Sequence, residues 1–125
     1  MLQHIEGALA ALPYPERPEG LYDPIRFILA GGGKRLRPML LLTAYSLYHS
    51  DFTPAVSAAI GIEMYHNHTL VHDDLMDHAD VRRGRPTVHK RWNENTAVLS
   101  GDTMLLLAYR LIAQSSVGRT DEVMR

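Results

Sequence analysis

A run of acids, histidines and arginines lies between two apolar segments of this sequence, at residues 66–87, and reads HNHTLVHDDLMDHADVRRGRPT. Three of its aspartates lie close together, with the second and third one and four residues after the first: Asp73, Asp74 and Asp77. Two adjacent arginines, Arg82 and Arg83, follow within about two helical turns. A fold that buries so polar a stretch must give its charges partners or a function. We interpret the stretch as a magnesium-dependent diphosphate site.

Helical spacing places His66, Asp73 and Asp77 on one face. Two carboxylates at i and i+4 are close enough to share or flank a metal ion, and without a cation they would repel each other. Oxygen ligands alone favour Mg²⁺ or Mn²⁺ over zinc. The guanidinium groups of Arg82 and Arg83 suit phosphate oxygens, which they bind through two parallel hydrogen bonds. The alternative is an acidic helix end paired with nearby arginines by ordinary salt bridges.

A second anion site is predicted upstream, where residues 31–38 read GGGKRLRP. Three glycines end a helix, and Pro38 suits the first turn of the next one. The three cations between them, Lys34, Arg35 and Arg37, lie beside free amides and the positive end of a helix, and both features favour an anion. The alternative is a solvated basic turn before a core helix.

The rest of the chain predicts an all-α fold, because no stretch alternates as a half-buried strand does. Asp23-Pro24 predicts a helix start, and Asn93 or Asn95 predicts a cap for the last long helix. We expect helices at about 2–11, 24–30, 38–49, 54–77 and 96–114, a short turn at 87–92 and a further helix from Thr120. The segments around 39–47 and 104–112 are apolar almost all the way round. Such helices are surrounded by others, so we expect more chain after Arg125 or a second subunit.

Composition excludes several classes of function. The chain has no cysteine, which removes disulfide and thiolate chemistry. A formal net charge of -1 gives no general affinity for nucleic acid. No apolar run approaches the roughly 18–20 residues of a membrane span, and the N-terminus lacks the pattern of a secretory signal. We therefore expect a cytoplasmic protein.

Four motifs together resemble the trans-isoprenyl diphosphate synthases, the polyprenyl synthetase family. They are GGGKRLRP at 31–38, HNHTLVHDDLMD at 66–77, RRGRPT at 82–87 and SGD at 100–102. The resemblance implies an all-helical, isoprenoid-synthase-like bundle that forms a homodimer and requires Mg²⁺. It further implies that isopentenyl diphosphate is joined to an allylic diphosphate, head to tail at the 1′ and 4 carbons, to give a short- or medium-chain polyprenyl diphosphate.

The resemblance also assigns roles to individual residues. The diphosphate of isopentenyl diphosphate is expected on one group of side chains: Lys34, Arg37, His66 and Arg83. The magnesium ions that bridge to the allylic diphosphate are expected on Asp73 and Asp77, and Arg82 is expected to contact that same diphosphate. Lys34, Arg82 and the two aspartates are the expected catalytic residues. His68 and Thr69, just upstream of the aspartates, are expected to limit the product to about C15–C20.

The family's second aspartate-rich motif has no counterpart here, because Asp102 and Asp121 are isolated. Residues 1–125 are therefore expected to be the N-terminal part of a single synthase domain that does not condense the two substrates alone. A non-catalytic partner subunit of a prenyl synthase is one alternative. Another is an all-helical metal phosphohydrolase that uses His66, His72 and Asp73, with His68 and His72 at zinc spacing. The other histidines are interpreted as surface or hydrogen-bonded residues: His4, His49, His78 and His89.

Overall fold

The computed structural model describes residues 1–14 and 19–115. The helix expected from Thr120 lies outside these ranges. The described elements, in chain order, are α1 (Leu2–Ala10), α2 (Glu19–Ala30), α3 (Leu36–Ser46), the 3-10 turn η1 (Thr53–Ala55), α4 (Val56–Met76), β1 (Val81–Arg82), β2 (Arg85–Pro86), α5 (Val88–Arg91) and α6 (Glu94–Ala113).

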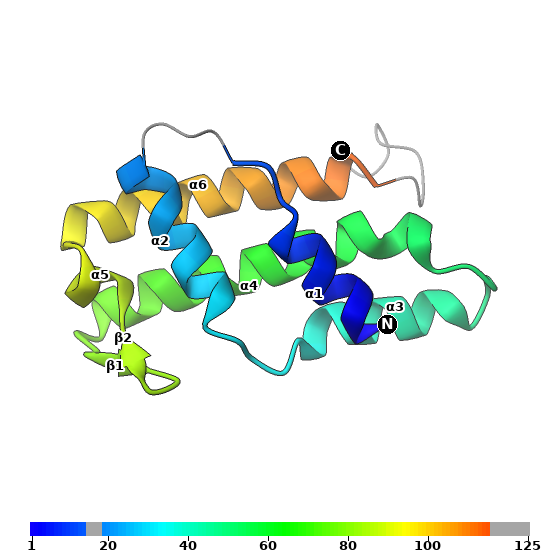
Figure 1. Ribbon diagram of the computed structural model, residues 1–125, viewed down its shortest axis with the longest axis horizontal. Helices are drawn as coiled ribbons and strands as arrows, with labels where there is room; N and C mark the ends of the chain where they lie inside the picture. The colour runs from blue at the N-terminus through cyan, green and yellow to red at the C-terminus, as the bar shows by residue number, and fades with distance from the viewer. Residues whose placement is uncertain (15–18, 116–125) are drawn as a thin grey trace.

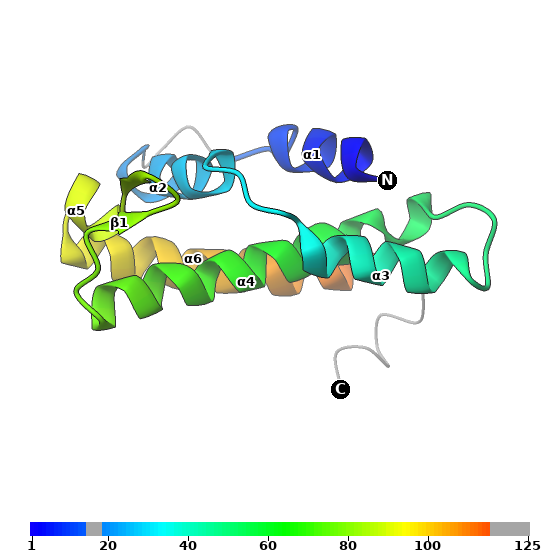
Figure 2. The same cartoon turned by 90° about the horizontal axis from the view of Figure 1, so that it is seen from below.

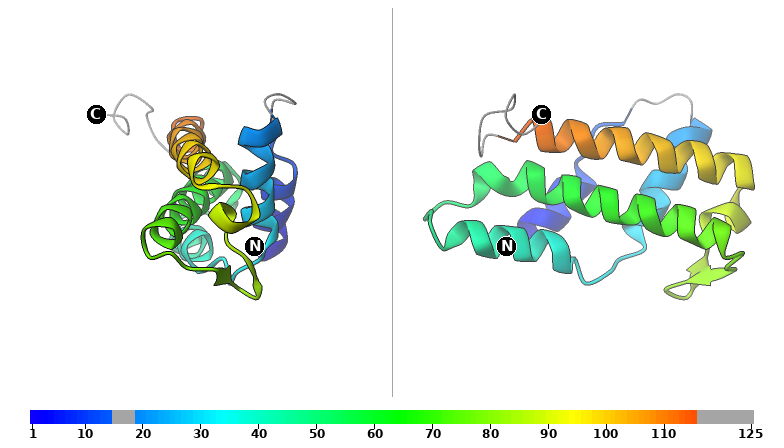
Figure 3. Two further views of the ribbon diagram at one scale, coloured as in Figure 1. Left: turned by 90° about the vertical axis from the view of Figure 1, so that its left-hand side faces the viewer. Right: turned by 180° about the vertical axis from the view of Figure 1, so that it is seen from behind.

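The two long helices, α4 and α6, run antiparallel side by side, and α3 lies along the other side of α4 (Figure 1). Helices α1 and α2 lie across one face of this layer (Figures 2 and 3). The core between them is formed by fully buried side chains that include Ile5, Ile25, Leu42, Met64 and Met104. The prediction of an all-α fold is confirmed.

Close packing of α4 on α6 depends on Gly61. A Cβ atom at this position would lie 2.9 Å from Ile112 Cγ1 and 3.1 Å from the Ala108 carbonyl oxygen. Both distances are too short for an ordinary carbon contact, so the two helices approach more closely here than any other residue would allow. One helical turn earlier, the Ser57 hydroxyl donates to the Leu111 carbonyl at 2.6 Å.

The first correction concerns the expected helix start at Asp23-Pro24. Helix α2 begins at Glu19, and Pro24 lies inside it and is fully buried. A proline in a helix removes one backbone hydrogen bond. The Ser100 hydroxyl on α6 donates to the Leu21 carbonyl at 2.8 Å, so packing on α6 supports the turn of α2 that precedes the proline.

The second correction concerns residues 79–86, where no strand was expected. Val81 pairs with Pro86 and Arg82 with Arg85 in an antiparallel hairpin. The two residues between the paired arginines are in the left-handed region, with φ of 55° at Arg83 and 75° at Gly84. A two-residue turn with positive φ at both positions and glycine second is a favoured hairpin connection. Two-residue strands are too short to show alternation in the sequence.

Several large apolar side chains of α3, of its C-cap and of α6 are exposed, on the helices that the sequence marks as apolar almost all the way round. The exposed fraction is 59% for Leu40, 75% for Leu47, 69% for Leu106 and 52% for Tyr109. Helix α6 is long and apolar enough to cross a membrane by length and composition alone. A core helix meets the same criterion, and α6 packs along α4 and against α2 and α5.

Candidate functional site

The glycine turn after α2 is folded tightly against the hairpin. Gly32 and Gly33 have φ of 88° and 126°, a region that side chains rarely adopt. A Cβ atom on Gly33 would lie 3.1 Å from Arg83 Cζ, and Arg83 Nη1 donates to the Gly32 carbonyl at 2.8 Å. Glycine at this position therefore lets the arginine of the hairpin pack directly on the turn.

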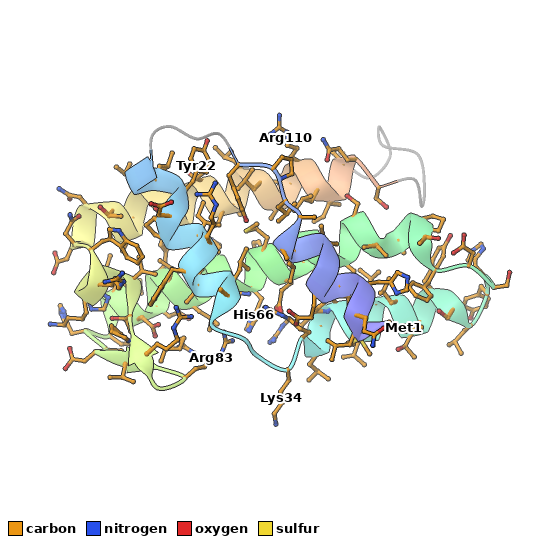
Figure 4. All side chains as sticks on the ribbon, in the orientation of Figure 1. Met1, Tyr22, Lys34, His66, Arg83 and Arg110 are labelled. Atoms are coloured by element: carbon orange, nitrogen blue, oxygen red, sulfur yellow. The ribbon has the colours of Figure 1, made fainter. Side chains whose placement is uncertain are left out.

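A pocket of about 200 Å³ lies where the turn, α3, α4 and the hairpin meet. Most of the residues that line it are charged or titratable, and the other two are a glycine and a leucine: Gly33, Lys34, Arg35, Leu36, Arg37, Glu63, His66 and Arg83. Arg37 Nη1 lies 3.3 Å from His66 Nε2. Figure 4 shows Lys34 projecting outward from the turn, with His66 on α4 close by. The four side chains expected to bind isopentenyl diphosphate all line this one pocket.

Like charges crowd this pocket and change its titration. Burial lowers the pKa of His66, and the charges of Arg37, Arg83 and Arg82 lower it further, while Glu63 opposes them. Burial and the neighbouring cations both favour the neutral imidazole of His66. Burial, and then the charge of Arg82, also lowers the pKa of Arg83. An anion among these side chains would relieve the repulsion between the cations.

Arg35 corrects the expectation that all three cations of the turn face an anion. It is 3% exposed, and each guanidinium nitrogen has a protein partner. Nε donates to Glu6 at 2.7 Å, Nη1 to Glu63 at 3.1 Å and Nη2 to the Leu29 carbonyl at 2.6 Å. Burial acts to lower the pKa of Arg35, but the hydrogen bonds to Glu6 and Glu63 raise it above its ordinary value. Two cations of the turn, Lys34 and Arg37, remain for a ligand.

At the end of α4, Asp74 and Arg82 form a bidentate ion pair. Asp74 is 5% exposed, and it accepts from Arg82 Nε at 2.7 Å and from Arg82 Nη2 at 2.8 Å. This hydrogen bonding raises the pKa of Arg82. The salt-bridge alternative considered for the acidic stretch therefore describes this pair, which fixes the hairpin to α4. Arg82 Nη1 makes no hydrogen bond within residues 1–14 and 19–115.

Asp73 and Asp77 lie in and just after the last turn of α4, and both are exposed. Within the described part of the chain, neither carboxylate has a hydrogen-bond or ion-pair partner. The same part holds no group of three or more acidic or histidine side chains placed for a metal. Two unpaired carboxylates suit Mg²⁺, which keeps several water ligands and binds through one or two carboxylates together with substrate phosphates. The donor set fits magnesium shared with a ligand, and it does not fit a closed protein cage.

The histidines of the phosphohydrolase alternative are otherwise engaged. His72 Nε2 lies 3.6 Å from Asp102 Oδ1, and the rings of His68 and His72 meet edge to face at 4.6 Å. His68 Nδ1 lies 2.8 Å from the Gly101 carbonyl oxygen, so this side chain faces α6, while the Thr69 hydroxyl donates to the His66 carbonyl. His89 corrects another expectation, because it is buried and neither ring nitrogen has a hydrogen-bond partner.

The fold and the site define an all-helical protein with a cation-lined pocket beside an exposed pair of carboxylates. The family model of the polyprenyl synthetases matches residues 18–125. The chain belongs to this family.

Individual relatives agree with that assignment. The geranylgeranyl diphosphate synthase of Methanosarcina mazei is 41% identical over 111 residues, which are 89% of this chain and 34% of the relative. The solved structure of geranylgeranyl pyrophosphate synthetase from Pyrococcus horikoshii has a TM-score of 0.89 at 36% identity, over 98% of this chain and 38% of the other. A geranyltransferase from Helicobacter pylori, solved with magnesium and isoprenyl diphosphate, has a TM-score of 0.83 at 28% identity, over 98% of this chain and 45% of the other. The chain spans about a third of the length of the curated relatives it matches.

Proposed function

We propose that the chain forms the N-terminal part of a prenyl diphosphate synthase that joins isopentenyl diphosphate to an allylic diphosphate. One observation carries the proposal. Lys34, Arg37, His66 and Arg83 come from three separate parts of the sequence and line a single pocket. That pocket would hold the diphosphate of isopentenyl diphosphate, since cations and backbone amides bind phosphate oxygens. The names of the relatives support a short-chain product of the geranylgeranyl class.

The second substrate would bind at the end of α4. Asp73 and Asp77 would hold magnesium for the allylic diphosphate. A related geranyltransferase was solved with magnesium and isoprenyl diphosphate, which supports magnesium as the cofactor. Bound magnesium supplies positive charge that stabilises the departing diphosphate. Asp74 holds Arg82 in place, and Arg82 would direct its remaining nitrogen, Nη1, to the same diphosphate.

In the proposed reaction the allylic C1–O bond breaks, and the diphosphate leaves with the electron pair. The double bond of isopentenyl diphosphate attacks C1 through C4, and transfer of one proton to the released diphosphate restores an alkene. The part played by this chain is to hold both diphosphates. Arg82 stabilises the charge that develops on the leaving group, while Lys34, Arg37 and Arg83 fix the second substrate nearby, which replaces a bimolecular encounter. The chain by itself is proposed not to complete the reaction, and recovery of a longer prenyl diphosphate from the chain, Mg²⁺ and both substrates would contradict this.

A calorimetric titration tests whether the two diphosphates bind separately. We expect isopentenyl diphosphate to bind without Mg²⁺, and geranyl diphosphate to bind only with it. Lys34→Gln should weaken the binding of isopentenyl diphosphate and leave that of geranyl diphosphate unchanged. Asp73→Asn combined with Asp77→Asn should weaken the binding of geranyl diphosphate and leave that of isopentenyl diphosphate unchanged. Equal dependence of both ligands on Mg²⁺, or on the same variant, would refute the assignment of two sites.

We also propose that the whole synthase is a homodimer. The outward apolar side chains of α3 and α6 support this, because a protein rarely leaves such side chains uncovered in large contiguous patches. Either a second copy or the remainder of a longer chain would cover them.

A further inference from the structure

Arg35 is a buried cation within the segment that presents the pocket's ligand-binding cations. Its three nitrogens reach three different elements: Glu6 on α1, the Leu29 carbonyl on α2 and Glu63 on α4. An arginine fork is suited to such simultaneous contacts, because its donors are fixed in one plane. The guanidinium therefore joins three helices directly beneath the glycine turn.

The backbone at Arg35 shows what these contacts hold in place. Arg35 is the N-cap of α3 and has φ of 52° and ψ of 36°, a left-handed conformation that is unfavourable for a residue with a Cβ. Lys34 precedes this kink and Arg37 follows it in the first turn of α3. The direction of both side chains therefore depends on the conformation that the buried guanidinium maintains.

Glu63 gives Arg35 an electrostatic role as well. This carboxylate is buried, lines the pocket and lies one helical turn before His66. An unpaired negative charge there would repel a diphosphate and would be costly to bury. The Arg35 Nη1 to Glu63 Oε2 bond of 3.1 Å offsets that charge.

We infer that Arg35 is a positioning residue for the diphosphate pocket, which holds Arg37 beside His66, sets the backbone that carries Lys34 and neutralises Glu63 without itself contacting the ligand. The inference rests on the proposed function. It also separates the three cations of the turn into two that bind and one that positions.

The decisive variant is Arg35→Lys, which keeps the charge and removes the fork. Arg26→Lys is the matched control, because Arg26 forms an exposed ion pair with Asp23 on α2. Inorganic pyrophosphate is titrated into each folded protein by calorimetry, and thermal unfolding is recorded on the same samples. We expect Arg35→Lys to weaken the binding of pyrophosphate about 10- to 100-fold, as replacing the residues that orient metal ligands weakens metal binding. Arg26→Lys should bind as the wild type does.

A second measurement needs no ligand. The ring of His66 is titrated by NMR, where its surroundings are Arg37, Glu63, Arg82 and Arg83. If Arg35→Lys releases the turn, Arg37 moves away and Glu63 loses its partner, so the pKa of His66 should rise toward its ordinary value. Weaker pyrophosphate binding with unchanged His66 titration would show that the turn keeps its geometry without the guanidinium, and it would overturn the positioning role.

The remaining outcomes are also decisive. Wild-type affinity and unchanged His66 titration in folded Arg35→Lys would refute the inference and leave the proposed function standing. Wild-type protein that binds no pyrophosphate would refute the proposed function, and the His66 titration would still decide whether Arg35 sets the geometry. If Arg35→Lys does not fold, the double variant Arg35→Gln/Glu63→Gln replaces the buried charged pair by two neutral amides and takes its place in both measurements.

Discussion

The three aspartates of the central motif should respond to the same substitution in opposite ways. Asp74→Asn removes a carboxylate that is 5% exposed and accepts two hydrogen bonds from Arg82. The amide keeps one acceptor oxygen and turns a donor toward the guanidinium. Asp73 and Asp77 are exposed on the same helix end, so Asp73→Asn and Asp77→Asn are matched controls.

The expected loss of stability depends on the Arg82 guanidinium, which Asp74→Asn leaves without its carboxylate partner. Removing one partner of a buried ion pair costs about 3–5 kcal/mol, but the Arg82 side chain is 30% exposed and stays partly hydrated. We therefore expect Asp74→Asn to lower the free energy of unfolding by about 2 kcal/mol, with one hydrogen bond to a charged group lost. Each control should change it by less than about 0.5 kcal/mol, because neither carboxylate has a partner to lose.

Urea unfolding followed by circular dichroism measures this difference. A loss of about 2 kcal/mol shifts the midpoint by roughly 1 M for a protein of this size. Magnesium-dependent binding of geranyl diphosphate should show the reverse order, with the two controls losing it. The reasoning is refuted if Asp74→Asn is as stable as Asp73→Asn, or if all three variants lose the same stability.

Three further predictions test separate parts of the structure. Lys34→Gln should weaken pyrophosphate by about tenfold or more with unchanged thermal unfolding, since Lys34 has no partner within the described residues; a stability change would contradict this. Gly61→Ala should destabilise the protein by about 1–3 kcal/mol by overpacking α4 against α6, whereas Gly7→Ala, with open space around it, should stabilise α1 by up to about 1 kcal/mol. Because the pKa of His66 is lowered in the folded state, the unfolded chain takes up that proton first as pH falls through about 6.5. Stability should therefore decline below that pH, less so in His66→Gln, and equal decline in both proteins would contradict the assignment.

The sequence predicted the helices well where local chemistry decides their ends. Asn93 caps α6 as expected, with its side chain accepting from the Thr96 amide at 2.7 Å. Pro24 misled the prediction because a tertiary contact from Ser100 supports a turn of helix before it. The hairpin was missed because its strands are two residues long, although the glycine of RRGR is a recognisable turn signal.

The site was predictable at the level of residue types and helical faces. Spacing alone separated Asp73 and Asp77 from Asp74, and the structure places the first two in solvent and the third against Arg82. Spacing could not show that Arg35 is buried while Lys34 and Arg37 stay available to a ligand. Which of three adjacent cations turns inward depends on Glu63, a residue 28 positions away, and on the left-handed backbone at the turn.

The central claim is that one pocket of this chain holds the diphosphate of isopentenyl diphosphate. A crystal structure of the chain with that ligand tests it most directly. We predict phosphate oxygens within about 2.7–3.2 Å of side-chain nitrogens of Lys34, Arg37 and Arg83, with His66 at the same diphosphate. A diphosphate bound elsewhere on the chain, with these four side chains left uncontacted, would contradict it.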